Sequence, residues 1–533
     1  MPRFGVSFRV NLNARKSAGD NISCLMTWRP QYRCSKFRHV FGKPASKEAC
    51  YDGVPITRSV HDNHLCAVNP RFLAVITESA GGGSFVVLTL HHTGKVDPHH
   101  PKVTGHRSNV LDLKWNPFND YCIASCSEDT TVKVWEVPPQ GLLRNLTAPW
   151  KELQGHSRRV GLLEWHPTAS NILFSTAYDY QVMIWNLDCP EQVIKNPLRT
   201  ISHHPDVVLS LAFSTDGSLM ATTCKDRKVR LIEPQTGSLL QESKTKVHRA
   251  AKVLILGNLK MILTTGTSIW NVRQIALWKQ DDLSVPLLQE DLDGGSGILF
   301  PFYDPDTHML YVVGKGDASF RYYEISAEKP YLNYLTDYRS LLPQKGMGVM
   351  PKRGLDVTSC EVFRFYKLVT TKSLIEPVSM IVPRRSESYQ EDIYPMTPGN
   401  IPAMTSQEWI DGVKRGKHHA CMYSYLSLVK GVDTRRSQSR PGLLQLSYIQ
   451  GQLDSTKGSK EAGGNDKGHE DGSPLSNGQD LALCSPPKTE NELRLKFHKQ
   501  QEEIRRLREL LNQRDVRIMQ LELEINNVKN LHS

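Results

Sequence analysis

The chain has 533 residues, of which 39% are hydrophobic and 23% charged, and it carries a formal net charge of +11. This length is too great for one ordinary core, so repeats or several domains are expected, and no run of about 18 apolar residues is present that could span a bilayer. A basic surface attracts acidic partners such as nucleic acid, anionic lipid or an acidic protein polymer, and the sign of the charge alone does not choose among them.

Residues 1–32 are predicted to be a disordered N-terminal extension. Residues 1–60 contain eleven Lys or Arg against three Asp or Glu, a local balance of +8. The first 25 residues are basic and poor in acids but lack an apolar core of secretory type, which disfavours a targeting signal. The eleven cysteines are irregularly spaced and contain no C-x-x-C pair. They therefore predict neither a zinc site nor a disulfide framework, and they favour a reducing compartment.

The sequence contains three copies of a twelve-residue motif. Ala124–Trp135 reads ASCSEDTTVKVW, Phe174–Trp185 reads FSTAYDYQVMIW and Ala221–Ile232 reads ATTCKDRKVRLI. In each copy a hydroxyl side chain precedes an aspartate by four positions, and an apolar run with period two comes next. This pattern predicts a strand, a tight turn and a second strand. A histidine lies 22 or 23 residues before each aspartate.

Units of roughly 50 residues with this order of His, Ser or Thr, Asp and Trp are typical of the blades of a WD-repeat β-propeller. In the proteins that the pattern resembles, the four side chains form a hydrogen-bonded chain within a blade, so the histidines are expected to be structural and not catalytic. The residues predicted to form these chains are His106, Ser125, Asp129 and Trp135, then His156, Ser175, Asp179 and Trp185, and then His204, Thr222 and Asp226.

Weaker copies at residues 61–95, 248–278 and 314–325 bring the count of blades to six. A propeller avoids a free sheet edge by closing on itself, so a seventh blade is expected from the two ends of the array. We predict that Ser35–Gly42 and the stretch around Cys360–Leu368 pair in one sheet and close the ring. The predicted fold is an all-β, seven-bladed WD-repeat β-propeller over residues 33–370.

The composition changes beyond residue 370. Leu374–Gly399 is too rich in proline for a sheet interior and too apolar to remain in solvent, so residues 371–430 are predicted to form an irregular strap packed on the propeller. Within it, the motif RRSES at Arg384–Ser388 fits either a kinase target or a charged loop. Residues 431–487 are polar, rich in Gly and Ser and without period, which predicts a flexible, disordered linker.

Residues 488–530 are predicted to form a C-terminal α-helical coiled coil that joins several copies of the chain. Thr489 and Glu492 fit a capping box, and apolar residues then repeat in heptads. Arg517–Glu522 matches an R-h-x-x-h-E pattern seen in short trimeric coiled coils, so a trimer is favoured, while a dimer and a tetramer stay open. The expected interface residues are Ile504, Leu507, Leu511, Arg517, Ile518, Leu521, Glu522 and Ile525.

Several segments of the sequence resemble the coronin family. They are SKFRHVFGK, CAVNPRFLAV, ESAGGGSF, FPFYDPDTHMLYVVGKGD, MPKRGLDV and IVPRRSESYQEDIYP. The segment MTWRPQYRCSKFRHVFGKPASKE resembles the N-terminal part of the type 2 branch of this family. The resemblance runs from about Met26 to the end and lapses in the linker. It implies an adaptor, without catalysis or cofactor, that binds actin filaments and organises the cytoskeleton as a homo-oligomer. This is physically coherent, since actin filaments are acidic and joined propellers add weak contacts as avidity.

The chain departs from the family at one expected actin contact. Type 1 members commonly carry an arginine where this sequence has Pro55. Filament binding is therefore expected to depend on other basic residues or on the coiled coil, although the same residues are equally well explained as a solvated face. The candidate actin-binding residues are Arg33, Lys36, Arg38, Lys43, Lys47 and Arg58.

Two other classes of function compete with this interpretation. An enzyme is disfavoured, because no G-x-S-x-G, Walker or H-E-x-x-H motif is present and the paired histidines lack metal-ligand spacing. A scaffold in a nuclear transcription corepressor complex is the stronger alternative, since propellers are general docking discs and part of the type 2 branch resembles components of such assemblies. The lack of a dense basic import signal favours the cytoplasm and cytoskeleton over the nucleus, and no direct binding of nucleic acid is expected.

Overall fold

The computed structural model describes most of the N-terminal four-fifths of the chain. Contacts divide the chain into two units, residues 1–437 and residues 438–533, and the fold described below belongs to the first. No helix within the described residues is both long and apolar enough to cross a membrane. The predicted extension, linker and coiled-coil interface lie outside the described part. The residues described are 35–78, 82–245, 249–385, 389–420, 422 and 506.

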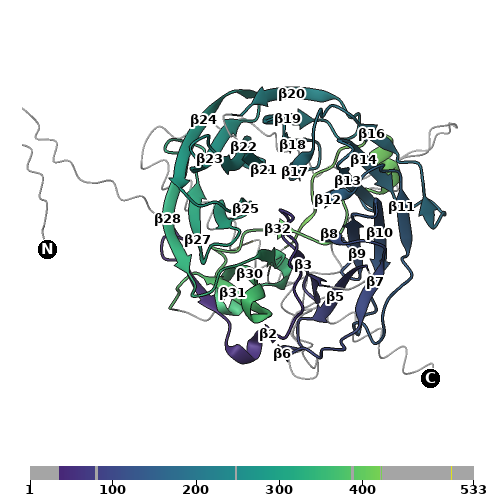
Figure 1. Ribbon diagram of the computed structural model, residues 1–533. Helices are drawn as coiled ribbons and strands as arrows, with labels where there is room; N and C mark the ends of the chain where they lie inside the picture. The colour runs from purple at the N-terminus through teal and green to yellow at the C-terminus, as the bar shows by residue number, and fades with distance from the viewer. Residues whose placement is uncertain are drawn as a thin grey trace, which may run out of the picture. The chain divides into compact units, whose positions relative to one another are not determined.

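Seven antiparallel sheets form a ring, each with an inner strand facing the centre and an outer strand at the rim (Figure 1). The seven-bladed propeller predicted from the sequence is confirmed. The inner strands are β3 (Cys66–Val68), β8 (Val110–Trp115), β12 (Val160–Trp165), β17 (Val208–Phe213), β21 (Arg249–Ile255), β25 (Leu299–Asp304) and β29 (Gly346–Val349). The second strands are β4 (Phe72–Thr77), β9 (Cys122–Ser127), β13 (Ile172–Ala177), β18 (Met220–Cys224), β22 (Met261–Thr267), β26 (Met309–Gly314) and β30 (Glu361–Val369).

The outer half completes a four-stranded meander in the first six blades, and N-terminal strands complete the seventh. The third strands are β5 (Gly83–Thr89), β10 (Thr131–Glu136), β14 (Val182–Asn186), β19 (Lys228–Ile232), β23 (Arg273–Lys279), β27 (Ser319–Ile325) and β31 (Leu374–Ile381). The outer strands are β7 (Lys102–His106), β11 (Lys151–Gln154), β16 (Arg199–Ile201), β20 (Leu239–Lys244), β24 (Asp282–Asp293) and β28 (Leu332–Arg339), with β1 (Phe41–Pro44) and β2 (Tyr51–Asp52) in the seventh blade. Two-residue strands β6 (Gly94–Lys95) and β15 (Val193–Ile194) pair in parallel with β2 and β11.

Burial explains why the second strands combine small and apolar residues. Strands β9 and β13 are buried at every position, because each blade packs against a neighbour on both faces. The sequence of a strand that is covered on both faces is a continuous run of apolar and small residues, without strict alternation of apolar and polar residues. Ala124, Ser125 and Cys126 are small enough to let the adjacent sheets approach, and the serine hydroxyl requires a partner in this interior.

The two ends of the array meet in the seventh blade. Strand β1 pairs with β31 from Phe41↔Ile381 to Pro44↔Val378, and β31 pairs with β30. The two segments predicted to close the ring therefore share one sheet, although β31 lies between them. Tyr322 in the sixth blade fixes the N-terminal segment further, because its Oη donates a hydrogen bond to the carbonyl of Val40 at 2.7 Å.

The expectation that proline excludes Leu374–Gly399 from a sheet interior is wrong. The first eight residues of this segment form β31, which is a central strand of the seventh blade. Pro377 is tolerated because it lies between the segments of β31 that pair with β1 and with β2. The carbonyl of Pro377 accepts a hydrogen bond from Ala45 N at 2.8 Å, on the side of β31 that faces β1 and β2. Because the N–H and C=O of one strand residue point to the same side, the N–H that proline lacks would also face the space between β1 and β2. The hydrogen bonds between β31 and β30 are therefore kept. The propeller thus continues past residue 370.

Residues 382–385 and 389–420 extend from the seventh blade to the third and fourth. Tyr394 Oη donates to the carbonyl of Glu361, and Ala403 N donates to the carbonyl of Thr168. Trp409 is buried against Phe174, with ring centroids 6.2 Å apart. This segment contains the pair β32 (Thr397–Pro398) and β33 (His419–Ala420) and the helix α1 (Ser406–Ile410). Short 3₁₀ helices lie at η1 (Lys47–Ala49), η2 (Gly257–Leu259), η3 (Lys352–Gly354), η4 (Val357–Ser359) and η5 (Thr370–Lys372).

Candidate interaction surface

In the second blade the four predicted side chains form one hydrogen-bonded chain. Trp135 Nε1 donates to Ser125 Oγ at 2.8 Å, and Ser125 Oγ lies 2.8 Å from His106 Nε2. His106 Nδ1 lies 2.9 Å from Asp129 Oδ2, which also accepts from Arg107 N. A neutral histidine that accepts at Nε2 and donates at Nδ1 satisfies every member of the chain, which a buried polar network requires.

The third blade repeats the chain and shows which loops share a face. His156 Nδ1 lies 2.9 Å from Asp179 Oδ2, and Trp185 Nε1 donates to Ser175 Oγ at 2.8 Å. The histidine follows an outer strand and the aspartate lies in the turn between second and third strands. These two kinds of connection therefore lie on the same side of the ring, which we call the His–Asp face.

The fourth blade differs from the expected pattern. His204 Nε2 lies 2.9 Å from Thr222 Oγ1, but Asp226 binds the guanidinium of Arg230 and the Nδ1 atom of His204 has no partner. Burial, reinforced by the charge of Arg230, lowers the pKa of His204 to about 4. Ile232 replaces the tryptophan and is fully buried, so Thr222 receives no indole N–H.

The glycine before each complete histidine makes room for the tryptophan. A Cβ on Gly105 would lie 3.0 Å from Trp135 Cη2 and 2.9 Å from the carbonyl oxygen of Thr147. A Cβ on Gly155 would lie 2.9 Å from Trp185 Cη2. The Gly-His pair is therefore part of the packing of the indole ring as well as of the hydrogen-bonded chain, which the sequence pattern alone did not indicate.

The hydrogen-bonded chain predicts a pH dependence of stability. Burial alone would raise the pKa of Asp179, but hydrogen bonds from His156, Gln181 N and Ser157 N lower it below its ordinary value. A carboxyl group with a lower pKa in the folded state contributes stability above its unfolded pKa of about 3.9 and loses it as the pH falls through the folded pKa. Asp179→Asn should therefore be less stable than wild type at neutral pH by about 2 kcal/mol, and this difference should shrink below about pH 4.

Urea unfolding of both proteins between about pH 3 and pH 7 measures this difference. Asp281→Asn removes an exposed carboxylate and is the control, since it should leave the pH profile of wild type unchanged. A difference between Asp179→Asn and wild type that stays constant across the range would contradict the assignment.

The candidate basic residues lie along the outer edge of the seventh blade and not in one patch. Lys36 Nζ donates to the carbonyl of Asp392, and Arg38 follows in the same turn. Lys43 lies in β1 and Lys47 in η1, both exposed. Arg58 is separate, because its backbone N–H binds Glu78 Oε2 in a turn of the first blade. Arg33 falls outside the described residues.

Pro55 lies close to Arg58, in the connection from β2 to β3. Its carbonyl accepts from Glu78 N at 3.0 Å, so this loop is fixed against the turn after β4. Proline at this position supplies no cation, which leaves Arg58 as the described basic residue of this short loop.

Basic side chains that the sequence pattern did not single out lie on the His–Asp face. Arg107, Arg158 and Arg159 are exposed in the loops that follow β7 and β11. Arg159 stacks over the ring of Tyr178 at 3.9 Å. Their position directly after the Gly-His pairs was the available signal. Within the described residues, no group of three or more His, Cys, Asp and Glu side chains is arranged to hold a metal ion.

Comparison with known proteins identifies the family. The chain is 62% identical over 519 residues to coronin-2A from Homo sapiens, covering 95% of this chain and 99% of the relative. It is 59% identical over 505 residues to coronin-2B from Homo sapiens, covering 95% and 98%. The solved WD40 domain of Toxoplasma gondii coronin is 28% identical with a TM-score of 0.67, covering 72% of this chain and 97% of that chain.

Three family models match five segments of the chain. They are a domain of unknown function (DUF1899) at residues 30–95, the WD domain, G-beta repeat, at residues 99–136, 148–186 and 195–233, and a type of WD40 repeat at residues 375–416. The sequence patterns favoured the 2A over the 2B subtype, and both are close in identity. The chain therefore belongs to the coronin family, is similar to coronin-2A, and is built on a seven-bladed WD40 β-propeller.

Proposed function

We propose that the protein is a non-catalytic adaptor that binds actin filaments and organises the actin cytoskeleton in the cytoplasm. The observation that carries this proposal is similarity to coronins over 95% of the chain, because the family resemblance implies filament binding. Exposed loops held by rigid sheets are the usual positions of binding residues, and the propeller supplies them on both faces.

Self-association is the second part of the proposal. The heptads of residues 488–530 would join several propellers, with a trimer favoured. Each propeller then needs only a weak contact with the filament, since joined contacts add as avidity.

We place the filament contact at the outer edge of the seventh blade. Its outer strands come from the basic N-terminal part, where residues 1–60 carry a balance of +8. Lys43 and Lys47 are exposed there. A cationic edge is complementary to an acidic filament and would also speed the encounter at low salt.

Reversing these charges should weaken filament binding. The double variant Lys43→Glu with Lys47→Glu is expected to lower the affinity for actin filaments about tenfold at low salt, since each screened contact is worth up to about 1 kcal/mol. Co-sedimentation of the full chain with filaments over a range of filament concentrations measures this change.

The double variant Arg107→Glu with Arg158→Glu is the matched control, because it makes the same change of charge on the His–Asp face. It should bind within about twofold of wild type, as expected for rim charges away from the contact. Equal weakening by both variants would indicate general attraction only and would contradict the proposed contact. The absence of any pelleting at low salt would remove the proposed function.

A further inference from the structure

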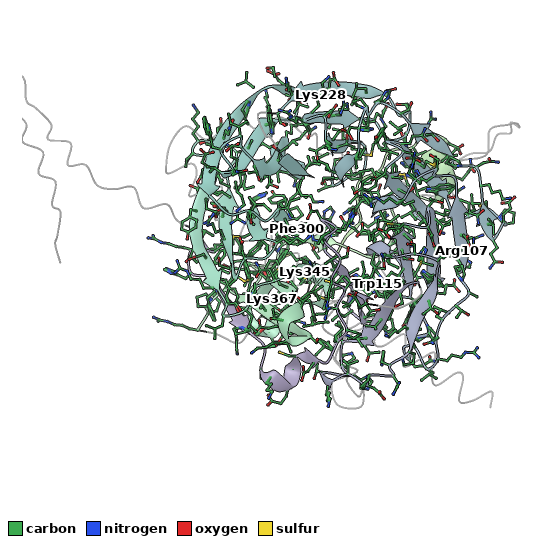
Figure 2. The ribbon with its side chains drawn as sticks, in the orientation of Figure 1. Arg107, Trp115, Lys228, Phe300, Lys345 and Lys367 are labelled. Atoms are coloured by element: carbon green, nitrogen blue, oxygen red, sulfur yellow. The ribbon has the colours of Figure 1, made fainter. Side chains whose placement is uncertain are left out.

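Four lysines from four different blades lie around the centre of the ring. Lys114 belongs to β8 and Lys252 to β21, while Lys315 follows β26 and Lys345 precedes β29. Figure 2 shows Lys345 and the buried Phe300 toward the middle of the ring, with Lys228 at its rim. Like charges gathered on inner strands are costly unless anions offset them, so their partners decide what this region can bind.

Two of the four lysines are neutralised within the protein. Lys114 Nζ binds Glu164 Oε2 at 2.7 Å. Lys315 Nζ binds Asp62 Oδ1 at 2.9 Å and two backbone carbonyls at 2.8 Å. The remaining carboxylate, Asp112, accepts backbone N–H bonds from Leu113 and Leu163 at 3.0 Å each. Glu164 and Asp62 are therefore paired with lysines, whereas Asp112 is held by backbone N–H groups and acts on Lys252 through its charge.

The other two lysines form no ion pair with a described carboxylate. Lys252 is only 9% exposed, and its Nζ donates to the carbonyl of Leu209 at 3.0 Å without a carboxylate partner. Burial lowers the pKa of Lys252 to about 8, with Asp112 and Asp62 opposing the shift and the neighbouring lysines adding to it. Lys345 is half-buried, and within the described residues its ammonium group makes no hydrogen bond or ion pair, although its backbone N–H donates to the carbonyl of Leu368 at 2.8 Å. Burial and the charge of Lys315 lower its pKa as well.

A buried histidine lies beside the same aromatic ring as Lys252, and its backbone binds the strand that follows Lys345. The ring of His64 lies 4.8 Å from that of Phe300 and 5.0 Å from that of Phe302, and Lys252 Nζ lies 5.8 Å from the centre of Phe300. The Nδ1 atom of His64 is buried without a hydrogen-bond partner. The carbonyl of His64 accepts from Met347 N, two residues after Lys345. The three side chains thus come from adjoining parts of the ring centre.

The strap covers this region on the side opposite the His–Asp face. It binds Thr168, which lies between an inner and a second strand, and Figure 1 shows β32 near the middle of the ring. Lys417 in the strap is sensitive to the charges of Asp306 and Glu164, although burial is the largest cause of its lowered pKa. The unpaired lysines are therefore reached from the His–Asp face, where Asp62 and Val60 are exposed.

We propose that Lys252, Lys345 and His64 form a binding site for a phosphate monoester dianion at the centre of the ring. Neither ammonium group has an ion-pair partner, and both can contact one group that carries two negative charges. The free ring nitrogen of His64 can donate a further hydrogen bond in its Nδ1–H tautomer. This site goes beyond the proposed function and does not depend on actin binding.

Calorimetric titration of the full chain tests the site. The probes are inorganic phosphate and N-acetyl-O-phosphoserine methylamide, each compared with acetate and chloride at constant ionic strength. We expect saturable binding of the phosphate probes, and Lys252→Met and Lys345→Met should each weaken it by about tenfold or more. Lys228→Met is the matched control, because it removes a lysine at the rim that pairs with Glu242, and it should bind like wild type.

A second readout separates binding from a loss of folding. An anion beside Lys252 should draw a proton onto its amine near pH 8, so the heat of binding should depend on the ionisation enthalpy of the buffer. This dependence should diminish in Lys252→Met, while Lys345→Met, at a half-buried position, should retain the wild-type thermal transition.

The outcomes also distinguish the source of the phosphate. Tighter binding of the phosphoserine probe indicates a phosphorylated molecule as the natural ligand, and equal or tighter binding of inorganic phosphate indicates the free ion. No binding of either probe above that of chloride, stronger binding of acetate, or equal weakening by Lys228→Met would overturn the proposal.

Discussion

Removal of residues 488–533 is expected to weaken the apparent affinity for actin filaments by about 10²- to 10⁴-fold, because a joined set of propellers rebinds before it diffuses away. The contact of a single propeller is expected to be weak, since Pro55 supplies no cation in the loop between β2 and β3. Co-sedimentation of the full chain and of residues 1–487 across filament concentrations measures the loss.

Replacing residues 488–533 by an unrelated trimeric coiled coil is the control, and it should restore most of the affinity if the tail acts by joining copies. Analytical ultracentrifugation should find the truncated chain to be a monomer. Filament binding by residues 1–487 that equals that of the full chain would show that avidity plays no part.

Trp185→Ala should lower the free energy of unfolding by about 3–5 kcal/mol, the usual cost of removing a large buried aromatic side chain. Trp185 is 0% exposed and packs against the backbone of Gly155, so its loss leaves a cavity between sheets. The loss also removes the N–H donor of Ser175, which in turn contacts His156. Urea unfolding followed by circular dichroism measures the change.

Trp270→Ala removes the same side chain from the turn between β22 and β23, where the residue is 81% exposed. This variant should change the free energy of unfolding by no more than about 0.5 kcal/mol. Similar effects of the two substitutions would show that Trp185 is not held by packing and hydrogen bonding as described.

The complete hydrogen-bonded chains were predictable because their members recur at fixed spacing within single blades. The arrangement in the fourth blade was not predictable, although its histidine and aspartate keep nearly the same spacing in the sequence. The cause is Arg230, at the position held by Lys133 in the second blade and Met183 in the third. Its guanidinium reaches Asp226, four residues before it, and displaces His204. The spacing in the sequence gives the position of a side chain in the blade, but its hydrogen-bond partner also depends on the length of the neighbouring side chains.

Two other features depend on contacts between distant segments. Proline content argued against a strand at Leu374–Ile381, because the sequence does not show that β1 and β2 leave a gap opposite Pro377. The ring-centre site was not visible either, since its lysines lie in different blades, and a single lysine in a strand is ordinarily a solvated one. Only the closed ring shows which of these cations lack an ion-pair partner.

The seventh sheet imposes an order on biosynthesis. Strand β1 leaves the ribosome well before its partner β31, which is made more than 330 residues later. At translation rates of about 5–20 residues per second, this interval lasts roughly 15–70 s. Throughout it the nascent chain carries an unpaired strand at one end and an unfinished row of sheets at the other, so chaperones have a defined period in which to protect them.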